Sequence, residues 1–115
     1  MELRLRRMAE NESLAREMNE RRRAHAVDVW AHLHSYPFYC ECAEAECDEM
    51  LSLSEAEYEH ARSHATWFVV ASGHARAEIE TVVEQSERFE IVEMRGDAAR
   101  LAQHWNARTR SEPTR

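Results

Sequence analysis

Three cysteines lie within eight residues of this chain and are its only thiols: Cys40, Cys42 and Cys47, in the stretch "FYCECAEAECDEM" at 38–50. Thiolates bind Zn²⁺, which takes four ligands in a tetrahedral arrangement, and one tight loop can supply three of them. A disulfide between Cys40 and Cys42 would be strained at this separation. C-x2-C is the commoner zinc pairing, so the C-x-C-x4-C spacing favours a metal site without being diagnostic of one.

A fourth ligand has to come from elsewhere in the chain, which contains seven histidines. His74 is predicted to be that ligand. It follows Gly73 directly after the apolar segment "TWFVVA", where a turn can direct the imidazole back over the end of a strand. His34, on the other side of Pro37, and a carboxylate near the cysteines are the alternatives. The predicted metal ligands are therefore Cys40, Cys42, Cys47 and His74, and the predicted cofactor is Zn²⁺.

Five acidic residues stand around and between the cysteines: Glu41, Glu44, Glu46, Asp48 and Glu49. Negative neighbours raise the pKa of a thiol, which is the opposite of what a nucleophilic cysteine needs. A centre with four protein ligands also leaves no coordination position for a catalytic water. The sequence therefore predicts a structural zinc site and no enzymatic activity.

A [2Fe–2S] cluster is the alternative cofactor. Cys40-x-Cys42 and the Cys47–Asp48 pair are similar to the ligand pattern of the CDGSH iron–sulfur family. The chain departs from that pattern in the short gap between Cys42 and Cys47, and in the lack of the glycine and histidine that should follow Asp48.

His60 and His64 form a second candidate metal pair at i, i+4. Ala61 stands where the zincin motif has its general base, so the pair is interpreted as two exposed histidines.

The elements that must position these residues suggest one α+β domain. A length of 115 residues suits a single modest core. No apolar run approaches about 20 residues, and the charged start is unlike a signal peptide, so a cytoplasmic location without membrane association is predicted. Helices are predicted at 1–33, 54–63 with Ser54 as N-cap, and 98–106 capped by Asp97. Strands are predicted at 36–40, 50–54, 66–71 and 88–94, while 78–85 is ambiguous.

These elements divide the chain into three segments: a helical segment at 1–34, a compact zinc-binding domain with a mixed or antiparallel sheet at 35–106, and a flexible tail at 107–115. Apolar residues in the first helix form a thin stripe that includes Met8, Leu14 and Met18. Two interpretations of this helix remain open. It packs on its own domain, or it serves as a docking or dimerisation element.

The charge distribution bears on the choice of partner. Residues 1–27 carry seven arginines and five acids, 28–94 carry three and fifteen, and 95–115 carry five and two; the sums +2, −12 and +3 give the net −7. An acidic body is poorly suited to nucleic acid, whose phosphates supply most of the binding energy. The predicted partner is another protein, bound through the N-terminal helix, with a homodimer as one form of it.

The order of motifs resembles an uncharacterised family of small actinobacterial proteins. The resemblance spans about residues 9–95 and rests on the cysteine cluster, an E-Y-E-x-x-R helix at Glu57–Arg62 and an F-V-V-x-x-G-H segment at Phe68–His74. It implies that His74 belongs with the cysteines, and it implies no activity. The sequence thus predicts a small zinc-binding module with a regulatory or protein-interaction role. A redox or metal sensor built on the cysteine cluster is the alternative.

Overall fold

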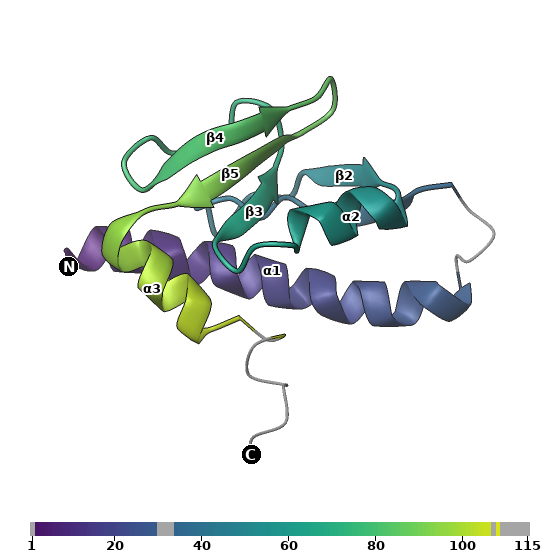
Figure 1. Ribbon diagram of the computed structural model, residues 1–115, viewed down its shortest axis with the longest axis horizontal. Coiled ribbons are helices and arrows are strands. Elements are labelled where there is room, and N and C mark those ends of the chain that lie inside the picture. Colours follow the sequence, from purple (N-terminus) through teal and green to yellow (C-terminus); the bar gives the residue numbers. More distant parts are fainter. Residues whose placement is uncertain (1, 30–33, 107, 109–115) are drawn as a thin grey trace, which may run out of the picture.

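A long helix, α1 (Leu3–Val29), runs beneath two small antiparallel sheets (Figure 1). The structure is a computed structural model that describes residues 2–29, 34–106 and 108. After α1 the elements are β1 (Tyr36–Tyr39), β2 (Met50–Leu53), α2 (Glu55–Ala61), β3 (Trp67–Val70), β4 (Glu80–Gln85), β5 (Glu90–Met94) and α3 (Gly96–His104). This arrangement confirms the predicted α+β class with its long N-terminal helix and antiparallel strands.

The strands form two separate sheets. β1 pairs with β2, with Phe38 opposite Leu51, and the other three strands form a sheet in the order β3–β5–β4. "TWFVVA" becomes β3, whose Val69 lies opposite Ile91 of β5. The ambiguous segment 78–85 becomes the edge strand β4, with a bulge between Val82 and Glu84. One sheet therefore carries the cysteine loop, and the other ends beside His74.

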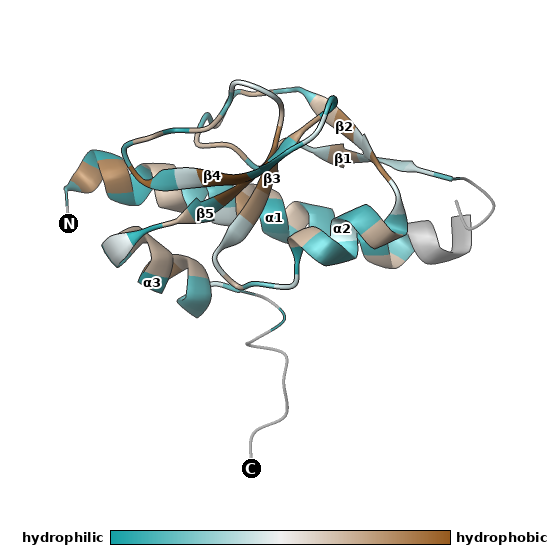
Figure 2. Ribbon diagram, turned by 45° about the horizontal axis from the view of Figure 1, so that its top comes forward, coloured by the Kyte–Doolittle hydropathy of each residue, from teal (hydrophilic) through white to brown (hydrophobic). Residues whose placement is uncertain are grey.

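The hydrophobic core lies between α1 and the sheets. Figure 2 shows the strongest hydrophobic colour on β3 and β5, whereas α2 is largely hydrophilic. Phe38, Phe68 and Val92 are fully buried, and the rings of Phe38 and Tyr58 stack with centroids 4.4 Å apart. Such parallel packing adds to the free energy gained by burying the two rings. The core thus fixes both the end of β1 and the end of β3, from which the cysteines and His74 follow.

The face of α1 that packs on the domain is unexpectedly polar. Besides Met8 and Ala9 it buries Glu12, Arg16 and Asn19, each no more than 2% exposed. The predicted apolar stripe is wrong at Leu14, whose exposed fraction is 59%. The helix takes this orientation because Arg16 and Asn19 donate to backbone carbonyls of the strands and of α3. Packing on its own domain is therefore what this face of α1 does.

Two boundary predictions have clear outcomes. The Ser54 cap is confirmed, since its hydroxyl accepts from the Glu57 N–H while the Glu57 carboxylate accepts from the Ser54 N–H. Asp97 does not cap α3: the N-cap is Arg95 and Asp97 lies in the first turn, because Gly96, with φ +63°, already redirects the chain. The predicted continuation of the first helix to residue 33 and the tail at 107–115 lie outside the described residues, apart from Arg108. Within the described part of the chain, no helix has the length and apolar character that a bilayer-spanning segment needs.

Candidate metal centre

Cys40, Cys42, Cys47 and His74 meet at one point of the fold. Their ligand atoms, three Sγ and one imidazole nitrogen, all lie within 4.8 Å of one another. Cys40 directly follows β1, Cys42 and Cys47 lie in the loop between β1 and β2, and His74 lies in the turn after β3. Loop and turn belong to different sheets. A single ion bound here would therefore connect the two halves of the fold.

Backbone hydrogen bonds hold the start of the cysteine loop against the end of β3. The Glu41 N–H donates to the Val69 carbonyl at 2.8 Å, and the Ala71 N–H donates to Cys40 Sγ at 3.1 Å. The Cys40 N–H donates to the Glu49 carbonyl at 3.2 Å, which closes the loop. The start of the cysteine loop thus lies beside the end of β3. This contact is made by residues that follow β1, because β1 itself pairs with β2.

The turn after β3 directs His74 at the cysteines. Gly73 has φ +85°, a conformation that side chains with a Cβ rarely adopt, and the His74 N–H donates to the Ala71 carbonyl at 2.9 Å. His74 Nδ1 lies 3.5 Å from Cys40 Sγ and 3.7 Å from Cys47 Sγ. In a tetrahedral Zn²⁺ site with ordinary bond lengths, the S···N edge is about 3.6 Å. These two pairs of ligand atoms already stand at about the separation that the ion requires.

The three thiols do not share one protonation state. Hydrogen bonding to Cys40 lowers the pKa of Cys42 to about 5, whereas the same hydrogen bond raises the pKa of Cys40. Burial raises the pKa of Cys47. The expectation that acidic neighbours raise every cysteine pKa is therefore wrong for Cys42, because the donors around its sulfur stabilise the thiolate. Zinc binds the thiolate form, so full ligation displaces the protons that the thiols still hold.

The centre is buried on one side and open on the other. Cys40 and Cys42 are 5% and 2% exposed, while Cys47 and His74 are half-buried. A pocket of ≈ 290 Å³ adjoins this side, lined by Cys42, Glu44, Gly73, His74, Ala75 and Arg76. Arg76 forms an ion pair with Glu44 at its edge. Solvent and small solutes can therefore reach the open side of the centre.

Glu41 has a role that the sequence did not suggest. It was grouped with the acidic loop residues, yet it is 1% exposed and points into the fold. Its Oε2 accepts from Asn19 Nδ2 at 2.8 Å, and its Oε1 accepts from the Val69 N–H at 3.1 Å. Its place between Cys40 and Cys42 means that this anchoring also fixes the two sulfurs. In the sequence, the one indication of this anchoring role is the polar residue Asn19 in the first helix.

A second buried carboxyl pair lies near Cys42. Glu12 is fully buried, Glu80 is 3% exposed, and the Glu80 Oε1 accepts from the Arg76 N–H at 2.7 Å. Burial raises the pKa of both carboxyls, and it raises the pKa of Glu12 more than that of Glu80. The negative charge of Glu80 raises the pKa of Glu12 further. The two carboxyls can both be buried because the raised pKa of Glu12 favours its protonated form, which removes one of the two charges.

The alternative histidines lie elsewhere. His34 is exposed and is no member of the cluster. His60 Nε2 contacts Glu84 Oε2 at 2.6 Å, and His64 stacks on Trp67 with centroids 3.9 Å apart, so these two do not converge on one ion. Among the described residues, the group of three cysteines and His74 is the one cluster of metal-binding side chains.

Comparison of the chain with protein-family models, curated proteins and solved structures gives no match. The resemblance to the actinobacterial family stays a prediction. The cluster itself is therefore the feature of this chain that indicates its function.

Proposed function

We propose that this protein is a small zinc-binding module in which a structural Zn²⁺ connects the cysteine loop to the end of β3, and that it acts by binding another protein. The observation that carries the proposal is the convergence of Cys40, Cys42, Cys47 and His74 within 4.8 Å. Three thiolates and one imidazole form a donor set that closed, structural zinc sites use. With four protein ligands no position is left for a reacting water, so we assign the protein no enzymatic activity.

The spacing of the ligands favours one ion over a cluster. A [2Fe–2S] centre distributes its four protein ligands over two irons, so the two ligand pairs must stand apart. Here every ligand atom lies within 4.8 Å of every other, and Cys40 and Cys47 approach the same nitrogen of His74. This arrangement suits a single tetrahedral ion, and the thiolate-rich donor set favours zinc over magnesium or calcium.

Metal removal tests the structural role. A small domain gains folding free energy from a metal that joins distant segments. Chelation should therefore lower the melting temperature and loosen the cysteine loop, and one equivalent of Zn²⁺ should restore both. A melting curve and circular dichroism spectrum that do not change on chelation of a zinc-loaded sample would contradict a structural ion.

A redox or metal sensor is the second candidate, favoured by the open side of the centre. Cys47 is half-buried, and as a zinc ligand its sulfur would be a thiolate that an oxidant can reach. Hydrogen peroxide would take two electrons from two thiolates, join them as a disulfide and release Zn²⁺. Fast, dithiol-reversible zinc release at low peroxide would favour the sensor. Zinc that is retained while the fold stays intact would favour the structural role.

A further inference from the structure

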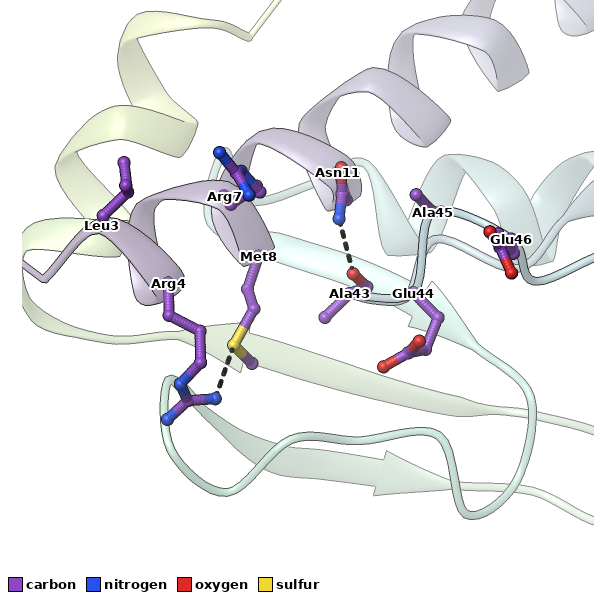
Figure 3. A pocket seen from close by; sticks show the side chains of 9 residues that line it. All are labelled: Leu3, Arg4, Arg7, Met8, Asn11, Ala43, Glu44, Ala45 and Glu46. Atoms are coloured by element: carbon purple, nitrogen blue, oxygen red, sulfur yellow. Dashed lines mark hydrogen bonds between the residues drawn. The ribbon is translucent and has the colours of Figure 1, made fainter.

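The outer face of α1 carries a short, regular stripe of exposed side chains: Leu3, Arg7, Glu10 and Leu14. At about 3.6 residues per turn these positions lie on one side of the helix, opposite the buried face. Leu3 is 66% exposed and Leu14 59% exposed, and among the described residues they are two of the five exposed large hydrophobics. Figure 3 shows Leu3 and Arg7 pointing to the same side of α1, away from the strands toward which Met8 points.

We propose that this stripe binds the same stripe of a second copy of the chain, with the two α1 helices antiparallel and related by a two-fold axis. The spacing 4, 3, 4 is that of alternating d and a positions of a coiled coil. One register brings Leu3 of each copy to Leu14 of the other and Arg7 of each to Glu10 of the other. The stripe is thus complementary to itself, as a two-fold interface requires.

Charge supports the second copy as the occupant. Beside the stripe lies an open pocket of ≈ 580 Å³ between the first turns of α1 and the cysteine loop at 43–46 (Figure 3). Its loop wall carries Glu44 and Glu46. Arg4 and Glu44 already form ion pairs within one copy, with Glu78 and Arg76, so in the proposed register Glu46 is the acid of this wall that the basic first turns of the second copy approach. The basic N-terminal segment of one copy therefore meets the acidic body of the other.

The monomer leaves the central pair of the stripe available. No ion pair or hydrogen bond of the Arg7 side chain is found among the described residues, and Glu10 contacts only Arg6, an exposed i, i+4 pair at 3.3 Å. Such a pair contributes a few tenths of a kcal/mol at most. Three helical turns and one loop bury less surface than an obligate dimer does, so the association should be reversible and depend on concentration.

This inference names a partner for the proposed interaction module, and it rests on α1 and not on the metal. The test is sedimentation equilibrium of the zinc-loaded full chain, as wild type, Arg7→Glu, Glu10→Arg and the double variant. Each single swap places like charges across the interface and should weaken dimerisation at least about tenfold. The double variant restores opposite charges and should recover the wild-type dissociation constant within about threefold.

Arg21→Glu, on the same side of α1 but beyond the paired positions, is the matched control and should leave the dissociation constant unchanged. Arg21 is a suitable control because its side chain is 72% exposed. A wild-type protein that stays monomeric at the highest concentration would overturn the proposal. So would single swaps without effect, or a double variant as weak as the singles. Zinc content measured on the same samples reports separately on the metal centre, so a failure of one claim is not mistaken for a failure of the other.

Discussion

Asn19 of α1 and Glu41 of the cysteine loop form a fully buried pair, with Asn19 Nδ2 donating to Glu41 Oε2 at 2.8 Å. The same amide donates to the Tyr39 carbonyl at 2.9 Å, and its Oδ1 accepts from the Tyr39 N–H at 2.8 Å. Glu41 in turn accepts from the Val69 N–H. Three distant segments therefore meet at a carboxylate that stands between two of the proposed zinc ligands.

Removing either member of this pair should loosen the metal centre. Glu41→Ala leaves one N–H of the Asn19 amide and the Val69 N–H unpaired in the interior, which should lower the free energy of unfolding by about 2–3 kcal/mol. Zinc affinity should fall about 10–100-fold, as it does when groups that orient a ligand are lost. Denaturant titration and competition with a zinc chelator measure the two effects.

Glu44→Gln is the matched control, because this acid of the same loop is 60% exposed at its side chain. Its effect on unfolding should stay within about 0.5 kcal/mol. Equal effects of the Glu41 and Glu44 substitutions would contradict a special role for Glu41.

The Glu12–Glu80 pair should make stability depend on pH. Because burial raises the folded-state pKa of Glu12 above the ordinary value of 4.5, its proton stabilises the fold fully below about pH 4.5. That contribution is lost as the pH rises through the folded-state pKa. Glu12→Gln supplies an N–H donor to Glu80 without a titrating proton, so it should stabilise the zinc-loaded protein more at pH 8 than at pH 5.

Melting temperatures of the wild-type protein and the Glu12→Gln variant at pH 5 and pH 8 test this prediction. Glu87→Gln, at an exposed position in the turn between β4 and β5, serves as control and should show no such difference. A Glu12→Gln variant that is destabilised equally at both pH values would contradict a protonated Glu12 in the fold.

Arg16 should not tolerate lysine. Its guanidinium is 2% exposed, donates to the Ala65 carbonyl at 2.6 Å and the Ala102 carbonyl at 2.9 Å, and lies 4.2 Å from the centre of the Phe68 ring. Burial lowers the pKa of Arg16 to about 10, so it stays charged at neutral pH. A lysine ammonium cannot reach both carbonyls in the same plane.

Arg16→Lys should therefore cost about 2–4 kcal/mol of unfolding free energy. Arg21→Lys, at an exposed position, should cost less than about 0.5 kcal/mol. Chemical denaturation checks both. A small effect at Arg16 would mean that water replaces the lost hydrogen bonds.

The site was predictable because its signals are local. The C-x-C-x4-C spacing marks a loop, and Gly73–His74 directly after an apolar strand marks a turn, so few arrangements remain. The Ser54 N-cap and β3 were predictable for the same reason, since each depends on residues close together in sequence. To predict His74 as the fourth ligand, it was enough to assume that the ends of two strands are neighbours.

The orientation of α1 was not predictable in this way. Its buried face contains Glu12, Arg16 and Asn19, whose partners are a distant glutamate, distant carbonyls and Glu41. A count of apolar residues places such a face toward solvent, which is why Leu14 was assigned to the wrong side. The strand at 80–85 stayed ambiguous because an edge strand with exposed valines lacks a clear alternation.

Elemental analysis of the purified protein, with a visible spectrum, shows whether the three cysteines and His74 bind zinc. We expect a colourless protein with about one zinc per chain, and a His74→Ala variant that binds zinc at least about tenfold more weakly. His34→Ala, the alternative histidine, should retain the wild-type zinc content. The proposed zinc centre would be contradicted by a wild-type protein that neither contains zinc nor takes it up, or that is brown with iron and sulfide. It would also be contradicted if the His34→Ala variant lost its zinc and the His74→Ala variant kept it.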